Sequence, residues 1–230
     1  MNSNTFASLM NAQEGVYDQR VLFEDFLDTA LLGFLRNPKT GKWEMQKELQ
    51  AILDKYPYKG ALLLGMLTAL DADIRERQEK NECIDVLGEY YEAHMQRVPF
   101  APWEVCKEMA QGIAPDGDDP VVIFHPSCQT GRVLLAAVEI AGIGNVFYGA
   151  ESDPICVKIA VLNLWSAGVV FGEITAADIS MPDSFRKSFV ISRNPPGIVK
   201  IERREDSGLW QYLHDSPEWL STSSQGSNVS

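Results

Sequence analysis

The sequence predicts an α/β fold in which an all-helical N-terminal region precedes a parallel sheet. Apolar residues between positions 16 and 96 recur at helical spacing, whereas four short apolar runs after Pro99 alternate with two helical segments. The order strand, helix, strand requires right-handed crossovers, which place successive strands parallel. The chain has 230 residues, of which 45% are hydrophobic and 23% charged, so it can bury a core of its own.

The N-terminal region, residues 1–97, is predicted to be a helical domain. Its first long helix ends at the segment Asn37–Gly41, because proline and glycine both interrupt helices. Further helices are expected from Trp43 to about Leu53, from Gly60 to Leu70 with an exposed charged continuation, and around residues 84–90. We expect the apolar surface of residues 16–70 to be core, and Trp43 and Trp103 to be buried packing residues.

Residues 98–205 are predicted to form the sheet domain. The expected strands cover residues 121–124, 145–148, 169–171 and 188–192, and the expected helices cover residues 130–140 and 154–165. Residues 206–230 are predicted to be a tail. There is room for a short strand at Ile198–Ile201 and a short helix at Gly208–Leu220, and the polar residues from Ser221 onward predict disorder.

Ligands of parallel sheets bind beyond the carboxyl ends of the strands, so the residues that follow each strand are the candidate site. Gly131 allows close backbone approach at a helix start, where an anion is favoured. Glu151 follows the second strand, twenty residues after Gly131, where a carboxylate accepts from the hydroxyls of a ribose. Alternatives remain open: the segment after Glu151 is also a helix cap before Pro154, and Asn194-Pro-Pro is also a common turn.

Five short segments follow one another along the chain and can be compared with known motifs. They are Pro99-Phe-Ala-Pro102, His125-Pro-Ser-Cys-Gln-Thr-Gly131, Tyr148-Gly-Ala-Glu151-Ser-Asp, Asp178 and Asn194-Pro-Pro-Gly197. Together they resemble the N6-adenine DNA methylase family, which uses S-adenosylmethionine. The best-matching branch resembles the modification subunits of type I restriction systems and the shorter methylases of phages and mobile elements.

The resemblance implies a Rossmann-like methyltransferase sheet that is truncated at the C-terminus, because only 33 residues follow Gly197. It implies S-adenosylmethionine as the cofactor. The cofactor-binding residues that it implies are Pro102, His125, Gln129, Gly131, Glu151 and Asp178. The catalytic residues would be Asn194, Pro195 and Pro196, since in the family this asparagine accepts from the amino group of a flipped adenine.

Four residues depart from the family pattern. His125 replaces an aspartate, Gln129 a glycine, Ala101 a threonine, and Gly197 the aromatic residue that stacks on the base. Two hypotheses follow. The chain is either a DNA adenine-N6 methyltransferase with a degenerate site, or an inactive pseudo-methyltransferase that binds or regulates within a mobile element or a restriction–modification system.

Charge and composition bear on the partners. The net charge of −12 opposes avid nonspecific binding to nucleic acid. Residues 186–204 are an exception, with six basic residues and one acidic residue, and form either a solvated face or a DNA phosphate contact. A partner methylase or specificity subunit would complete the truncated sheet. No apolar run is long enough to cross a membrane, no signal peptide is evident and the four cysteines are dispersed, so we expect a cytoplasmic protein without a metal site.

Overall fold

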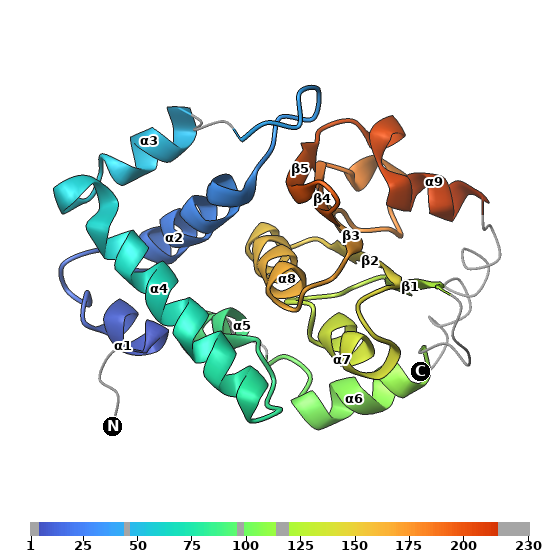
Figure 1. Ribbon diagram of the computed structural model, residues 1–230, viewed down its shortest axis with the longest axis horizontal. Coiled ribbons are helices and arrows are strands. Elements are labelled where there is room, and N and C mark those ends of the chain that lie inside the picture. The colour runs from blue at the N-terminus through green and yellow to red at the C-terminus, as the bar shows by residue number, and fades with distance from the viewer. Residues whose placement is uncertain (1–4, 44–46, 96–98, 114–119, 216–230) are drawn as a thin grey trace.

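The computed structural model describes residues 5–43, 47–95, 99–113 and 120–215. Its first half is helical, as the sequence predicts (Figure 1). The helices of this half are α1 (Phe6–Asn11), α2 (Gln19–Phe34), α3 (Lys47–Leu53), α4 (Pro57–Glu79) and α5 (Val86–His94), and α6 (Trp103–Gln111) follows them. The apolar and the charged stretches after Gly60 belong to one helix, α4.

The second half is built on a five-stranded sheet in the order β1-β2-β3-β4-β5. Its strands are β1 (Val122–His125), β2 (Val146–Glu151), β3 (Phe171–Ala176), β4 (Lys187–Arg193) and β5 (Pro196–Ile201). The first three strands are parallel, whereas β4 runs antiparallel to both β3 and β5. The prediction of a wholly parallel sheet is therefore wrong. The chain between Ala176 and Lys187 contains only the short 3₁₀ turn η1 (Pro182–Ser184), and a parallel return would need a longer crossover.

Helices cover both faces of the sheet. α7 (Arg132–Ala141) and α8 (Pro154–Ser166) pack on one face, and α9 (Gly208–Asp215) packs on the other. The alternation along β2 shows this, since Phe147 belongs to the main core while Tyr148 and Ala150 contact Leu209 and Leu213 of α9. The described residues thus form an α/β structure with a mixed, open sheet.

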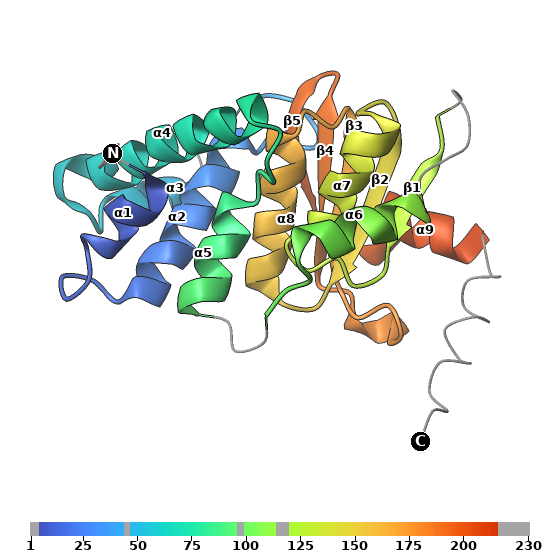
Figure 2. The same ribbon diagram turned by 90° about the horizontal axis from the view of Figure 1, so that it is seen from below.

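One hydrophobic core joins the N-terminal helices to the sheet. It includes Phe23 of α2, Leu87 of α5, Ile159 of α8 and Phe147 of β2, all almost completely buried. Figures 1 and 2 place α8 between the helical region and the rest of the sheet, and α2 and α5 pack against it. The predicted domain boundary at 97/98 lies outside the described residues.

Local signals explain most of the element ends. Asp18 caps α2 by accepting from the amide of Val21, and α2 ends just before the Asn37–Pro38 turn. Asp153 caps α8 in the same way, with Pro154 at the first helical position. The third strand begins two residues later than predicted. It includes the polar residue Glu173, which is tolerated there because its carboxylate accepts hydrogen bonds from the start of α9. The predicted short strand and helix near the C-terminus exist as β5 and α9, and the tail from residue 216 lies outside the described residues.

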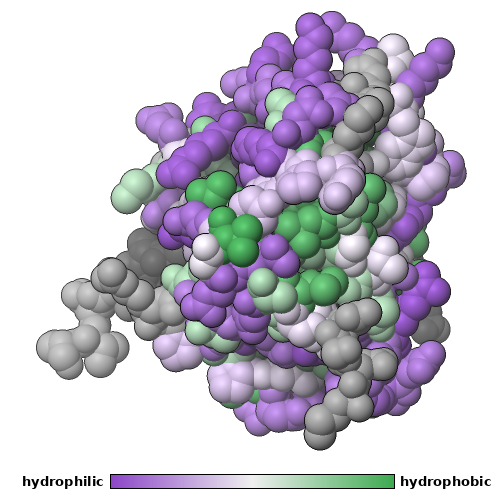
Figure 3. All heavy atoms as spheres, turned by 90° about the vertical axis from the view of Figure 1, so that its left-hand side faces the viewer, coloured by the Kyte–Doolittle hydropathy of each residue, from purple (hydrophilic) through white to green (hydrophobic). Residues whose placement is uncertain are grey.

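The surface formed by the N-terminal helices is mostly hydrophilic, with hydrophobic residues gathered near its centre (Figure 3). Exposed apolar side chains of this region include Val16, Tyr58 and Leu64. Within the described ranges, no helix combines the length and apolar character that crossing a membrane requires.

Candidate functional site

The carboxyl edge of the three parallel strands gathers most of the predicted cofactor residues. His125 ends β1, Glu151 ends β2 and Asp178 follows β3 by two residues. Since Glu151 pairs with Ala176 and His125 with Gly149 in register, these positions share one edge of the sheet. Gly131 begins α7 at the same edge, directly after the β1 loop.

Glu151 forms hydrogen bonds to the two loops that surround it. Its carboxylate is buried and accepts from the backbone amides of Gln129 (2.9 Å) and Asp153 (2.8 Å), and from the Ser152 hydroxyl (3.2 Å). A carboxylate offers about four acceptor directions, so three are already used. A ribose diol needs two acceptor directions. Glu151 as placed can therefore accept one further hydroxyl without a rearrangement.

The loop after β1 follows a path suited to glycine. Gln129 has φ +50° and Gly131 has φ +86°, both in the left-handed region. A Cβ on Gly131 would lie 3.3 Å from the Cβ of Ala160, which is a tight contact, so packing favours glycine there as well. Gln129 adopts a backbone conformation that favours glycine, and its side chain is exposed at the edge.

The other predicted cofactor residues have local roles. The Nδ1 atom of His125 is buried without a hydrogen-bond partner in the described part of the chain, and burial lowers the pKa of this imidazole. Asp178 accepts from both the amide (3.0 Å) and the hydroxyl (2.6 Å) of Ser180, which closes its own turn. Pro102 begins α6, one residue after a carbonyl that accepts from Arg132.

A buried polar network that the sequence analysis missed holds this edge in place. Asp85 is fully buried and accepts from the Thr130 hydroxyl (2.6 Å), Arg132 Nε (2.6 Å), Asn163 Nδ2 (2.7 Å) and the amide of Gly88 (2.8 Å). The network thus joins the start of α5, the β1 loop and α8. The signal in the sequence was Asp85 itself, an acidic residue between the apolar residues Ile84 and Val86, because a carboxylate among buried residues needs hydrogen-bond donors.

Helix α5 supplies two further supports. Arg132 Nη2 donates to Glu92 (2.8 Å), whose other oxygen accepts from the amide of Phe100 (2.9 Å). The hydroxyl of Tyr91 donates to Asp153 (2.9 Å), the cap of α8. The helical region therefore positions both loops at the carboxyl edge.

The predicted catalytic residues lie at the opposite edge of the sheet. Asn194 and Pro195 form the turn between β4 and β5, and Arg193 pairs with Pro196 across it. Because β4 is antiparallel, its end meets the start of β3, where the Arg193 amide donates to the Val170 carbonyl (3.0 Å). The length of β4, about 20 Å, separates this turn from Glu151. The expectation that Asn194, Pro195 and Pro196 adjoin the cofactor residues is wrong.

The basic residues of segment 186–204 are distributed rather than gathered. Arg186 and Lys187 lie at one end of β4 and Arg193 at the other. Lys200 pairs with Glu202 and Arg203 with Asp206, each at 2.8 Å. A DNA contact by the whole segment remains a prediction, and its basic residues lie at both ends of β4 and in and after β5.

No protein-family model matches this chain, and no curated protein is significantly similar to it. The resemblance to the N6-adenine methylases therefore rests on the motifs in the sequence.

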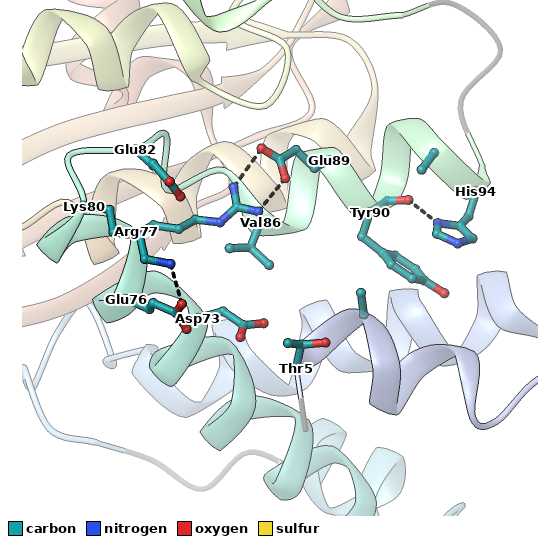
Figure 4. A pocket seen from close by; sticks show the side chains of 12 residues that line it. Thr5, Asp73, Glu76, Arg77, Lys80, Glu82, Val86, Glu89, Tyr90 and His94 are labelled. Carbon is teal, nitrogen blue, oxygen red and sulfur yellow. Dashed lines mark hydrogen bonds and ion pairs between the residues drawn. The ribbon is translucent and has the colours of Figure 1, made fainter. Parts of the chain in front are cut away.

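Two cavities lined by described residues lie away from the carboxyl edge. One, of about 390 Å³, is an open pocket lined mainly by residues of α1, α4 and α5 and of the segment between α4 and α5 (Figure 4). In it Arg77 points toward Glu89, with contacts of 2.7 and 2.6 Å, and Lys80 pairs with Glu76. The other, of about 430 Å³, lies beside Trp103 and Glu139. Neither is lined by Gln129, Glu151 or Asp178.

The cysteines and the metal-ligand residue types suggest no further chemistry. All four cysteines are buried and unpaired, and burial raises the pKa of Cys128 far above its usual value, so this thiol packs rather than reacts. The described residues contain no group of three histidine, cysteine or acidic side chains arranged to hold a metal.

Proposed function

We propose that this chain is a catalytically inactive, Rossmann-like pseudo-methyltransferase that acts by binding a partner. The observation that carries this proposal is the antiparallel direction of β4, which puts Asn194 at the edge away from Glu151. Methyl transfer to an amine depends on holding the amine against the sulfonium methyl group. A separation of about 20 Å along a strand prevents the asparagine from doing so.

The carboxyl edge supports the same proposal. The residues present fit S-adenosylmethionine only in part, because Glu151 is largely occupied by the backbone of its own loops and Gln129 adds a side chain beside it. We therefore derive no reaction through this cofactor. One observation favours the alternative of an active enzyme: Gly131, Glu151 and Asp178 do lie at one edge of the sheet.

The proposed partner is a methylase or specificity subunit of a restriction–modification system. In the described part of the chain, β1 is an outer strand with β2 as its only neighbour. An outer strand presents unpaired backbone groups, which can pair with a strand of another chain. The net charge of −12 suits a protein partner better than avid nonspecific DNA binding.

The test combines calorimetry with a methyl-transfer assay. We expect the purified chain to transfer no radiolabelled methyl group from S-adenosylmethionine to adenine-containing DNA, and to bind neither the cofactor nor its demethylated product in the micromolar range. The matched variant is Gln129→Gly with His125→Asp, which restores the family residues and is expected to raise cofactor affinity. Transfer of methyl groups to DNA adenine by the unmodified chain would overturn the proposal.

A further inference from the structure

Two turns that are far apart in the sequence meet at the edge of the sheet opposite Glu151. The segment after α2, residues 36–43, runs beside β5 (Figure 1). The Arg36 amide donates to the Ile198 carbonyl (2.8 Å), and a Cβ on Gly197 would lie 2.4 Å from Arg36 Cδ. The 36–43 hairpin therefore lies against the start of β5, next to the turn at Asn194.

This edge gathers basic residues of the described part of the chain. Arg36, Lys39 and Lys42 come from the hairpin, which has no acidic residue, and Arg193 comes from the end of β4. None of the four forms an ion pair with a carboxylate of the described residues, whereas most basic side chains elsewhere do. We call Arg36, Lys39, Lys42 and Trp43 the hairpin surface.

The hairpin surface also carries an aromatic ring. Trp43 is 50% exposed, so the expectation that it is a buried packing residue is wrong. The guanidinium of Arg36 lies 4.4 Å from the Trp43 ring and also donates to the Gly41 carbonyl (2.7 Å), which fixes its position. The guanidinium of Arg193 lies instead on α8, 3.8 Å from the ring of Trp165, so this residue is not part of the hairpin surface.

We propose that the hairpin surface binds single-stranded nucleic acid. Trp43 offers a half-exposed ring on which an unpaired base stacks, and the three basic side chains of the hairpin offer positive charge to the phosphates on either side. The side chain of Asn194 is exposed at the same edge. This inference goes beyond the proposed function and does not depend on it, because it uses neither the cofactor residues nor the edge of β1.

The acidity of the whole molecule does not prevent this binding. At physiological salt, charges act over roughly 8–10 Å, so a phosphate at the hairpin surface is governed mainly by the nearby cations. The exposed ring distinguishes the ligand class, since unpaired bases present their faces for stacking, whereas duplex bases are stacked on one another. An acidic peptide would use the cations but gain no base stacking on Trp43.

The experiment measures fluorescence anisotropy of a labelled oligo(dT) of about 20 nucleotides, at about 50 mM salt, with the full chain. We expect saturable binding that weakens steeply as salt is raised, together with a change in tryptophan emission. Trp43→Ala should weaken binding by about fivefold or more, through lost stacking. Lys39→Glu with Lys42→Glu should weaken it by about tenfold or more, through lost phosphate contacts.

The matched control is Arg20→Glu with Arg75→Glu, which makes the same change in net charge at exposed helical sites away from the hairpin surface. It should leave the affinity unchanged within about twofold. Circular dichroism verifies that each variant is folded.

Three results would overturn the proposal. They are absence of saturable binding by the unmodified chain, equal weakening by the control variant, and competition by polyglutamate as effective as that by the oligonucleotide, which would indicate an acidic protein partner. Tighter binding of a duplex than of the single strand would also count against it, because a duplex has no free base to stack on Trp43.

Discussion

At the scale of single residues, Asp85 shows how a buried charge is retained in this core. Its carboxylate has no exposed surface and accepts four hydrogen bonds, one of them from Arg132, whose side chain is only 10% exposed. Burying charges is costly, and the donors around Asp85 offset that cost. Removal of the carboxylate leaves the guanidinium of Arg132 buried, with Glu92 as its one charged partner among the described residues.

We therefore predict that Asp85→Ala lowers the free energy of unfolding by about 3–5 kcal/mol. Urea denaturation followed by tryptophan fluorescence measures the change. Glu76→Ala, which removes an exposed carboxylate from a surface ion pair, is the control and should change the free energy of unfolding far less than Asp85→Ala does. Equal effects of the two substitutions would show that the Asp85 network does not stabilise the fold.

The β1 loop offers a second prediction at residue scale. The backbone of Gln129 lies in the left-handed region, where a residue with a side chain is strained by about 1–2 kcal/mol. Glycine avoids this strain, but it loses about 0.5–1 kcal/mol more conformational entropy on folding. Gln129→Gly is therefore expected to change the free energy of unfolding by between zero and about +1 kcal/mol. Gly131→Ala, with φ +86° and a tight contact to Ala160, should instead destabilise by more than about 1 kcal/mol. A stabilising Gly131→Ala measured in the same urea assay would contradict this loop conformation.

His125 gives the third prediction, a dependence of stability on pH. Burial lowers the pKa of its imidazole in the folded protein below the ordinary value of 6.5, so below that pH the unfolded chain binds the proton first. The free energy of unfolding should thus fall as the pH is lowered below 6.5, and should not change through this group above about pH 7. His125→Gln should reduce that fall between pH 7.5 and pH 5. An unchanged fall in His125→Gln would show that other groups cause it.

At the scale of elements, α9 is fixed to the sheet by a buried carboxylate of β3. Glu173 accepts from the Ser207 hydroxyl (2.5 Å) and from the amides of Gly208 (2.9 Å) and Leu209 (3.2 Å). An anion at a helix N-terminus satisfies amides that have no partner within the helix and interacts favourably with the helix dipole. The glutamate inside β3 therefore serves the adjacent helix.

Glu173→Ala should consequently free α9 from the sheet. The substitution leaves three donors without their acceptor, at a cost of about 2–3 kcal/mol. Hydrogen exchange of the amides of residues 208–215 should accelerate markedly relative to that of α8. Glu202→Ala, an exposed carboxylate at the end of β5, is the control and should leave this exchange unchanged. Unaltered protection of α9 in Glu173→Ala would contradict this role.

At the scale of the whole molecule, the helical region and the sheet share one core. Phe23 and Leu87 from the helices belong to the same buried cluster as Phe147 and Ile159. The supports of the carboxyl edge, from Asp85, Tyr91 and Glu92, also come from the helical region. The stability of the sheet therefore depends on contacts from outside it.

We predict that the chain unfolds in a single transition, with coincident curves from far-ultraviolet circular dichroism and tryptophan fluorescence. A fragment that begins at residue 99 should lack the cooperative transition, because it exposes the apolar face of α8 that packs on α2 and α5. Two separated transitions, or a cooperatively folding fragment, would show that the parts are independent.

The sequence by itself determined the elements with strong local signals. Helix α2 stops where proline and glycine interrupt it, α8 begins at an aspartate followed by proline, and β1, β2 and their following loops lie where apolar runs meet polar strand ends. These features depend on residues within a few positions of one another, so their spacing along the chain is enough. The gathering of Gly131, Glu151 and Asp178 at one edge followed from the parallel strands alone.

Only the tertiary structure decided the features that depend on contacts between distant segments: strand direction, buried hydrogen-bond partners and exposure. The direction of β4 depends on a connection too short for a crossover, and it moved Asn194 to the other edge of the sheet. The side-chain partners of Asp85 and all three donors to Glu173 come from segments more than thirty residues away. The exposure of Trp43 depends on the hairpin that lies beside β5. A polar or aromatic residue has the same identity whether it is buried, paired or exposed. Packing against distant segments fixes which of these it is, and spacing along the chain does not carry that information.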